Sequence, residues 1–265
     1  MVRIEWVTGS NFILCFFVVW LVACFVIASL FPCQLVEPLV RGDSEMPIYD
    51  EDSLNEIYRN HWKMGWGSIA KDEVLFVQEL IENYRPRDFI EIGMASGLSG
   101  GILANILEEI GAKTFTTIDY DNTFFGDSSK ENGFLLSEIY SGSAVTVEKH
   151  PFTTSLDLSR LGKKFQMAFI DANHQHPWPA LDTLCLYPFL EGEKIIIHHD
   201  LKLFKEQDVV YGIGPKYLYD QFADEFRIDS DANRGNIYAL HLKNTDPEYI
   251  AKISINALSL SLIHI

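Results

Sequence analysis

The segment at residues 89–101, FIEIGMASGLSGG, constrains the fold of this chain more than any other. An apolar strand carrying Glu91 is followed by Gly93, three residues, Gly97 and the start of a helix. Glycines at a strand-to-helix turn allow close approach to the backbone, and a helix N-terminus favours a negative group. Ligands of open parallel sheets bind at the carboxyl ends of the strands. The segment therefore predicts an α/β fold with a nucleotide-type site at this turn.

Strand and helix patterns alternate along the rest of the chain, which predicts a parallel sheet with helices on both faces. The predicted strands are 88–92, 114–119, 144–148, 166–171 and 194–198. The predicted helices are two pieces within 51–84, then 98–110, one with its apolar positions at 134–136 and 139, and finally 178–190 and 215–226. A hairpin is predicted from 226–229 and 236–242. The expected fold class is α/β, a doubly wound, mostly parallel sheet with an antiparallel C-terminal hairpin, preceded by a single N-terminal transmembrane helix.

The N-terminal region contains the hydrophobic run that predicts this helix. Residues 12–31 are apolar except for Ser29, a length that spans the hydrocarbon core of a bilayer. We predict a signal anchor, and a cleaved signal peptide is the alternative because Ala28 and Ser29 offer small residues for cleavage. Arg3 precedes the run and favours a cytosolic N-terminus. The expected localisation is a single-pass membrane protein, with a Golgi-type lumenal domain in a eukaryote.

The predicted domain organisation has five parts. They are a tail at 1–11, the signal anchor at 12–31, a proline-containing stem at 32–50, the α/β domain at 51–250 and a tail at 251–265. The last six residues, LSLIHI, match one reading frame of a sequencing adaptor, so we expect a read-through artefact there, and an ordinary apolar tail is the alternative.

The charge balance narrows the class of partner. The chain has 265 residues with 21 Lys and Arg against 37 Asp and Glu, which gives a formal net charge of −16 at pH 7. An acidic surface repels phosphate backbones, so a nucleic-acid substrate is not expected.

A second nucleotide-binding feature follows the glycine turn. Asp119 ends the next predicted strand in TIDYDN, where a carboxylate can accept hydrogen bonds from both hydroxyls of a ribose. The glycine spacing is E-x-G-x-x-x-G and differs from the dinucleotide fingerprint G-x-G-x-x-G. The two features together favour a nucleoside cofactor over a dinucleotide.

Two further motifs, FIDANHQH at 169–176 and LEGEKIIIHHD at 190–200, complete the series. In this order the motifs resemble the S-adenosylmethionine-dependent methyltransferases of the Rossmann-like class. The D-x-x-H after the fourth strand and the H-D after the fifth are similar to the branch that includes macrocin-type O-methyltransferases and cephalosporin-hydroxylase-like proteins. The resemblance covers about residues 67–242.

The resemblance implies roles for particular residues. S-adenosylmethionine would be bound by Glu91, Gly93, Ser96 and Gly97 at its methionine end, Asp119 at its ribose and Ser155 near its adenine. A divalent cation would be held by Asp171 and Asp200. The catalytic residues would be Asp171 and His174, with His174 as the base.

The residue types agree with these roles. Asp171, His174 and Asp200 all fall at predicted strand ends, and paired carboxylates suit Mg²⁺. A cation lowers the pKa of a bound hydroxyl, and a nearby imidazole can accept the proton. Two alternatives stay open: His176 could be the working histidine, and an Asp at a strand end can simply cap a loop. His198 and His199 are further candidate metal ligands, but strand alternation places them on opposite faces, and we expect His198 to point into the sheet.

The predicted function is O-methylation of a small-molecule or glycan hydroxyl, with S-adenosylmethionine and Mg²⁺ as cofactors. The expected partners are that acceptor and, through the N-terminal helix, a membrane. Two alternatives remain: a non-catalytic membrane-anchored relative of the fold, and a nicotinamide-nucleotide oxidoreductase.

Overall fold

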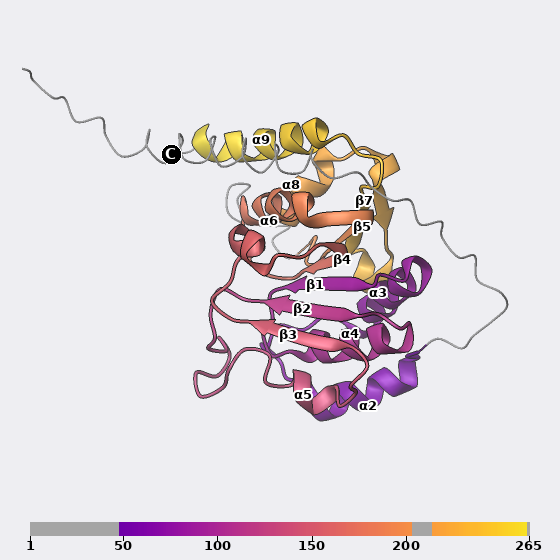
Figure 1. Cartoon of the computed structure of the whole chain (residues 1–265). Coiled ribbons are helices and arrows are strands. Elements are labelled where there is room, and N and C mark those ends of the chain that lie inside the picture. The colour runs from indigo at the N-terminus through magenta and orange to yellow at the C-terminus, as the bar shows by residue number, and fades with distance from the viewer. Residues whose placement is uncertain (1–47, 203–213, 264–265) are drawn as a thin grey trace, which may run out of the picture. The chain divides into compact units, whose positions relative to one another are not determined.

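The computed structural model of the chain describes residues 48–202 and 214–263 (Figure 1). The predicted signal anchor at 12–31 and most of the predicted stem lie outside the described residues. Within the described part of the chain, no helix has the length and apolar character needed to cross a membrane.

A seven-stranded sheet in the order β3-β2-β1-β4-β5-β7-β6 organises the described residues (Figure 1). Its strands are β1 (Asp88–Ile92), β2 (Thr114–Ile118), β3 (Thr146–His150), β4 (Phe165–Ile170), β5 (Leu190–His198), β6 (Arg227–Asp229) and β7 (Tyr238–His241). Strands β1 to β5 pair in parallel, whereas β7 pairs antiparallel with both β5 and β6. The predicted α/β fold with a mostly parallel sheet and an antiparallel C-terminal hairpin is confirmed.

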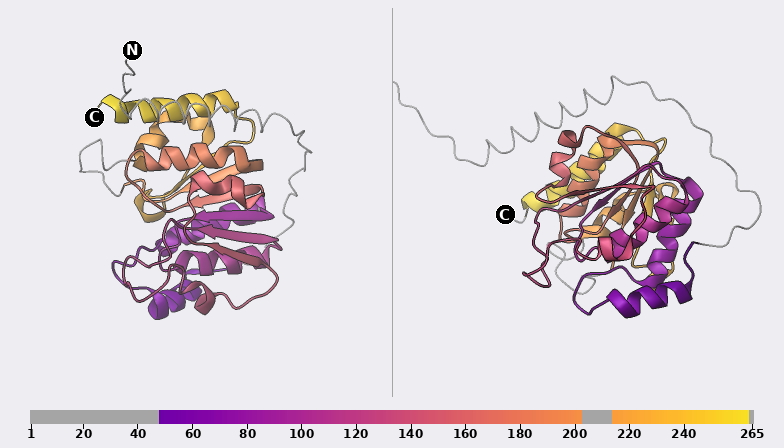
Figure 2. Two further views of the ribbon diagram at one scale, coloured as in Figure 1. Left: turned by 60° about the vertical axis from the view of Figure 1, so that its left-hand side comes forward. Right: turned by 60° about the horizontal axis from the view of Figure 1, so that its bottom comes forward.

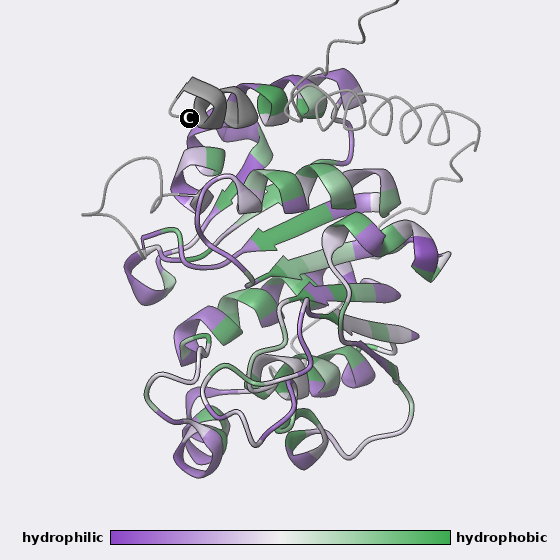
Figure 3. Ribbon diagram, turned by 90° about the vertical axis from the view of Figure 1, so that its left-hand side faces the viewer, coloured by the Kyte–Doolittle hydropathy of each residue, from purple (hydrophilic) through white to green (hydrophobic). Residues whose placement is uncertain are grey.

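Helices cover both faces of this sheet (Figure 2). The first group is α2 (Glu51–His61), α3 (Lys71–Tyr84), α4 (Leu98–Glu109) and the short α5 (Leu136–Ile139). The second group is α6 (Trp178–Leu186), α8 (Gly214–Gln221) and α9 (Pro247–Ile263). The central strands are the most apolar, whereas the edge strands and many loops are more polar (Figure 3).

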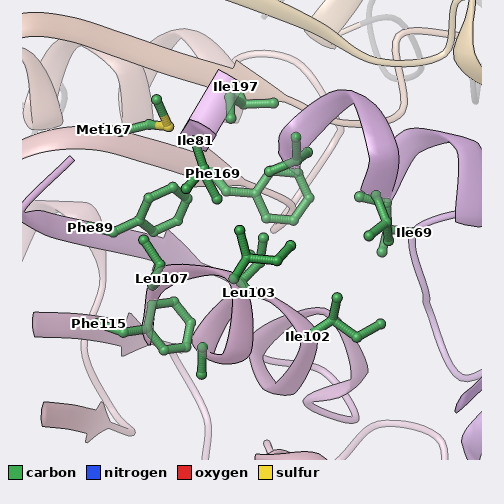
Figure 4. Close-up of a cluster of buried hydrophobic side chains, with 14 of the residues drawn as sticks. Ile69, Ile81, Phe89, Ile102, Leu103, Leu107, Phe115, Met167, Phe169 and Ile197 are labelled. Carbon is green, nitrogen blue, oxygen red and sulfur yellow. The ribbon is translucent and has the colours of Figure 1, made fainter. Parts of the chain in front are cut away.

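Strand alternation decides which residues reach the edge of the sheet on each face. Phe89, Phe169 and Ile197 all belong to the buried cluster under α3 and α4 (Figure 4). Side chains two residues apart in a strand lie on the same face, so Glu91 and His199 continue this face toward the carboxyl edge. The apolar core thus leads directly into a polar site between the sheet and the first group of helices.

Three elements differ from their predicted bounds. Helix α6 ends at Leu186 rather than near residue 190, because Pro188 lies in the following turn and cannot donate a helical hydrogen bond. Strand β3 begins at Thr146 instead of residue 144, because Glu108 accepts the backbone N–H groups of residues 144 and 145. Helix α9 continues across the boundary predicted between 250 and 251 and buries Ile250.

Candidate active site

The glycine turn after β1 is shaped by the chain's own close packing. Gly93 has a φ of +103°, and a Cβ there would lie 2.3 Å from the carbonyl oxygen of Asp171. Gly97 has a φ of +85° and begins α4, and a Cβ there would lie 2.7 Å from the Cα of Gly133. Both positions require glycine, because the backbone is left-handed there and another segment of the same chain packs too close for a side chain. The turn after β1 therefore lies directly against the end of β4.

Glu91 lies beneath this turn and is almost completely buried. Its carboxylate accepts hydrogen bonds of 2.7 Å from the hydroxyls of both Ser99 and Thr117, and Thr117 is its register partner on β2. Burial disfavours the ionised form and raises the pKa of Glu91 to about 8. The predicted cofactor-binding acid is thus a buried group that braces β1, β2 and α4.

Replacing Glu91 with glutamine is expected to change the pH dependence of stability. The folded-state pKa of Glu91 lies above that of an unfolded glutamate, so its contribution to stability falls as pH rises from about 4.3 to about 8. Glutamine cannot ionise, so the melting temperature of Glu91→Gln relative to the native protein should rise across this interval and level off above it. Thermal unfolding from about pH 5 to about pH 9 measures this difference. A constant difference would contradict the raised pKa.

Asp119 contacts this turn from the end of β2, and Ser96 lies within it. Asp119 accepts hydrogen bonds from the backbone N–H of Met94 at 2.9 Å and of Asp121 at 3.2 Å, so its carboxylate already fixes the glycine turn. The hydroxyl of Ser96 is buried, and it has no hydrogen-bond partner among the described residues. A buried hydroxyl without a partner is rare and fits a position that a polar ligand completes.

Ser155 lies at the start of the 3₁₀ helix η1 (Ser155–Leu161) and is buried. Its hydroxyl donates a 2.6 Å hydrogen bond to Asp182 of α6. Burial raises the pKa of Asp182 to about 6. Sequence reasoning missed Asp182 because it stands in an otherwise apolar helix; an acid in that context is itself a signal of a buried polar contact.

Four side chains converge where β4 and β5 end. Asp171, His174, His199 and Asp200 each offer one ligand atom, and these atoms all lie within 4.8 Å of one another. Nε2 of His174 lies 3.4 Å from Asp171 Oδ1 and 3.2 Å from Asp200 Oδ2. Nδ1 of His199 lies 2.9 Å from Asp171 Oδ1 and 3.6 Å from Asp200 Oδ1. The three residues predicted from strand ends are therefore together, and His199 joins them.

Glu73 of α3 is the residue of this cluster that the sequence did not reveal. It is fully buried, and its Oε2 lies 2.9 Å from Nε2 of His199. In the sequence, Glu73 looks like an ordinary acid in the first turn of a helix, three residues after Ala70. It does accept the Ala70 N–H in that role. The contact between Glu73 and His199 joins residues 126 positions apart, so it depends on tertiary packing that local sequence patterns do not reveal.

The charges in this cluster perturb one another strongly. Burial alone lowers the pKa of His199, but Asp171, Glu73 and Asp200 outweigh it and raise that pKa well above its ordinary value. Burial likewise opposes ionisation of Asp171, yet His199 and His174 hold its pKa well below the usual range. Three carboxylates thus surround two imidazoles, an excess of negative charge that attracts a cation.

The neighbouring histidines lie elsewhere. His198 is buried on the opposite face of β5, where its Nε2 lies 3.1 Å from the hydroxyl of Thr183, and burial lowers its pKa to about 3. His176 packs edge-on against Tyr217, with ring centroids 5.2 Å apart. Of the two histidines in the DANHQH motif, the structure brings His174 to the carboxylates.

Residues 90–201 match the family model described as a methyltransferase domain. The chain is also similar in structure to an O-methyltransferase from Bacillus cereus in complex with SAH, with a TM-score of 0.51, 16% identity and coverage of 84% of this chain and 98% of that one. A second similar structure is TomG from Streptomyces achromogenes, an O-methyltransferase involved in tomaymycin synthesis and bound to SAM, with a TM-score of 0.51, 16% identity and coverage of 83% and 96%.

A third similar structure is an SAH-bound methyltransferase from Podospora anserina, with a TM-score of 0.50, 14% identity and coverage of 76% of this chain and 100% of that one. A search of curated proteins finds no match. At these identities the structural likenesses establish the fold, and the family match covers both the glycine turn and the Asp171–Asp200 cluster.

Proposed function

We propose that this chain, which carries a methyltransferase domain of the Rossmann-like class, transfers the methyl group of S-adenosylmethionine to a hydroxyl oxygen with the help of a divalent cation. One observation carries the proposal: the glycine turn and the carboxylate cluster touch. A Cβ on Gly93 would lie 2.3 Å from the carbonyl oxygen of Asp171, so a cofactor held at the turn would end beside the cluster. Proximity of this kind aligns a methyl group with an acceptor oxygen.

The residues around the turn fit a nucleoside cofactor. The unpaired hydroxyl of Ser96 supplies a polar contact for its amino-acid end, and Asp119 has lone pairs left for ribose hydroxyls after its two backbone hydrogen bonds. Tyr120 follows Asp119 with 75% of its surface exposed, which offers an aromatic face beside that position. The sulfonium of S-adenosylmethionine supplies an electrophilic methyl group.

The cluster fits a divalent cation by its chemistry, because carboxylate oxygens and imidazole nitrogens converge within ligand reach. A cation bound there would lower the pKa of an acceptor hydroxyl. Asp171 and Asp200 would hold it from two adjacent strand ends. His174 lies on the loop after β4 with 17% of its side chain exposed, and it would accept the hydroxyl proton at Nε2.

The proposal also covers the methyl acceptor and the attachment of the protein to a membrane. An acidic chain with an oxygen-activating cluster suits a neutral hydroxyl acceptor, either a small molecule or a glycan. We extend the proposal to a single-pass protein anchored by residues 12–31, with a stem to residue 50 and the catalytic domain beyond it. The hydrophobic run of the sequence supports that arrangement.

Replacing Asp119 with alanine is expected to weaken S-adenosylmethionine binding by roughly 1.5–3 kcal/mol, because charge-assisted hydrogen bonds are lost. This corresponds to about a 10- to 150-fold increase in Kd. Calorimetric titration measures it. Asp127→Ala is the matched control, since Asp127 accepts a similar local backbone hydrogen bond from Ser129 in the same loop. Equal affinities for Asp119→Ala and the native protein would remove Asp119 from the site.

An acceptor panel tests the function itself. The protein is incubated with S-adenosylmethionine, a divalent cation and either sugar or phenolic hydroxyl compounds, and S-adenosylhomocysteine is quantified. We expect product with at least one class and its loss after chelation. Cofactor binding without product across both classes would instead support a non-catalytic binding module.

A further inference from the structure

His199 is the least exposed member of the Asp171, His174, His199 and Asp200 cluster. Its side chain is only 7% exposed, and both of its ring nitrogens face carboxylates. Nδ1 faces Asp171 and Asp200, whereas Nε2 lies 2.9 Å from Glu73. The ring cannot rotate without breaking contacts at both ends.

Glu73 is itself fixed by donors from two other parts of the chain. Its Oε2 accepts the N–H of Ala70 at 2.6 Å. Its Oε1 accepts the side-chain amides of Asn233 at 3.1 Å and Asn236 at 3.3 Å. A buried carboxylate with this many donors is a fixed acceptor for Nε2–H of His199. With the Nε2 proton held by Glu73, Nδ1 can direct its lone pair at a cation between the two carboxylates once that cation displaces the Nδ1 proton.

This arrangement matches the way proteins orient a metal-binding histidine, in which one ring nitrogen binds the ion and the other donates to a carboxylate. His174 lacks such support. It lies on a loop, its side chain is 17% exposed, and its ion-pair contacts among the described residues are the two carboxylates of the cluster. The contrast separates His199, which carboxylates hold at both ring nitrogens, from the more exposed His174.

We infer that His199 binds the cation through Nδ1 beside Asp171 and Asp200, that Glu73 positions it, and that this site prefers a first-row transition ion to Mg²⁺. The inference rests on the proposed function only in placing the cation in the same cluster. Mg²⁺ favours an all-oxygen octahedral shell, whereas imidazole favours ions such as Co²⁺ and Zn²⁺. Glu73 is a positioning residue because it acts through His199.

Metal titrations of the full chain test the positioning role. The metal-free protein is titrated with Co²⁺ and with Mg²⁺, and we expect Co²⁺ to bind at least about 100-fold more tightly. In Glu73→Gln an amide N–H₂ can face Nε2 and select the wrong tautomer, so Co²⁺ affinity should fall about 10- to 100-fold while Mg²⁺ affinity changes little. Glu79→Gln, on the exposed side of the same helix, is the matched control. An unchanged Co²⁺ to Mg²⁺ ratio in Glu73→Gln would overturn the inference.

A spectroscopic measurement avoids any dependence on whether Glu73→Gln folds. Proton NMR of the Co²⁺-loaded His174→Ala protein should show a strongly shifted, exchangeable ring N–H signal from His199, and its absence would overturn the inference. S-adenosylmethionine titrations of the same samples separate the two proposals. Cofactor binding without Co²⁺ binding would defeat this inference alone. Co²⁺ ligation by His199 without cofactor binding would defeat the proposed function alone.

Discussion

Replacing Asp200 with asparagine is expected to reduce turnover by on the order of 100-fold or more, while S-adenosylmethionine affinity stays nearly unchanged. A cation at the proposed site would stabilise developing negative charge by several kcal/mol, and the variant would remove one of its anionic ligands. Asp200 does not contact the glycine turn in any hydrogen bond of the described chain; its carboxylate accepts from Asn236 at 3.0 Å. The effect should therefore appear in turnover and in the response to cation concentration.

Asparagine is the appropriate substitution because Asp200 has a φ of +58°. Asparagine tolerates this left-handed backbone and keeps an oxygen that can accept from Asn236, so the fold should be retained. Asp52→Asn, on the exposed first turn of α2, controls for the loss of one negative charge. Steady-state kinetics at several cation concentrations give the result, and a fully active Asp200→Asn would remove Asp200 from the cation site.

Replacing Gly93 with alanine is expected to lower the free energy of unfolding by about 2–6 kcal/mol. A residue with a side chain at a φ of +103° costs about 1–3 kcal/mol in backbone strain. Its Cβ would also lie 2.3 Å from the carbonyl oxygen of Asp171, and relieving that overlap costs about 1–3 kcal/mol more. Because the clash is with backbone, the end of β4 must move, and Asp171 with it.

Gly111→Ala separates the cost of backbone strain from the cost of steric overlap. Gly111 has a φ of +77°, but a Cβ there would meet nothing within 4 Å. It should therefore show the backbone strain alone and retain cation binding. Denaturant unfolding of both variants measures the difference. Equal destabilisation would show that overlap between a side chain at residue 93 and the backbone of Asp171 contributes nothing.

The fold was largely predictable because its signals are local. The strand at 88–92, the glycines at 93 and 97 and the acid at 119 lie within one βαβ unit, where strand pattern and turn chemistry decide the structure. Asp171 and Asp200 were predictable for the same reason, since parallel strands bring their carboxyl ends to one edge. The resemblance to Rossmann-like methyltransferases inferred from these motifs is confirmed by the family match.

The supporting residues were not predictable because they arise from tertiary packing. Glu73 reaches His199 only after α3 packs on the sheet, and Asp182 reaches Ser155 only after α6 does. The sequence indicated that His198 and His199 face opposite ways and that His198 points into the sheet, and the structure agrees, with His199 meeting the carboxylates. Motif spacing thus identified the strand-end groups, whereas Glu73 and Asp182, which contact His199 and Ser155, came from helices on opposite faces of the sheet.

Calorimetric titration of S-adenosylmethionine into the purified protein tests the central claim most directly. We expect a single site with micromolar affinity, competed by S-adenosylhomocysteine, with a heat signal that Asp119→Ala diminishes. A protein that unfolds cooperatively, and is therefore folded, but gives no binding heat and no shift in melting temperature with either compound would contradict the assignment of the glycine turn as the cofactor site.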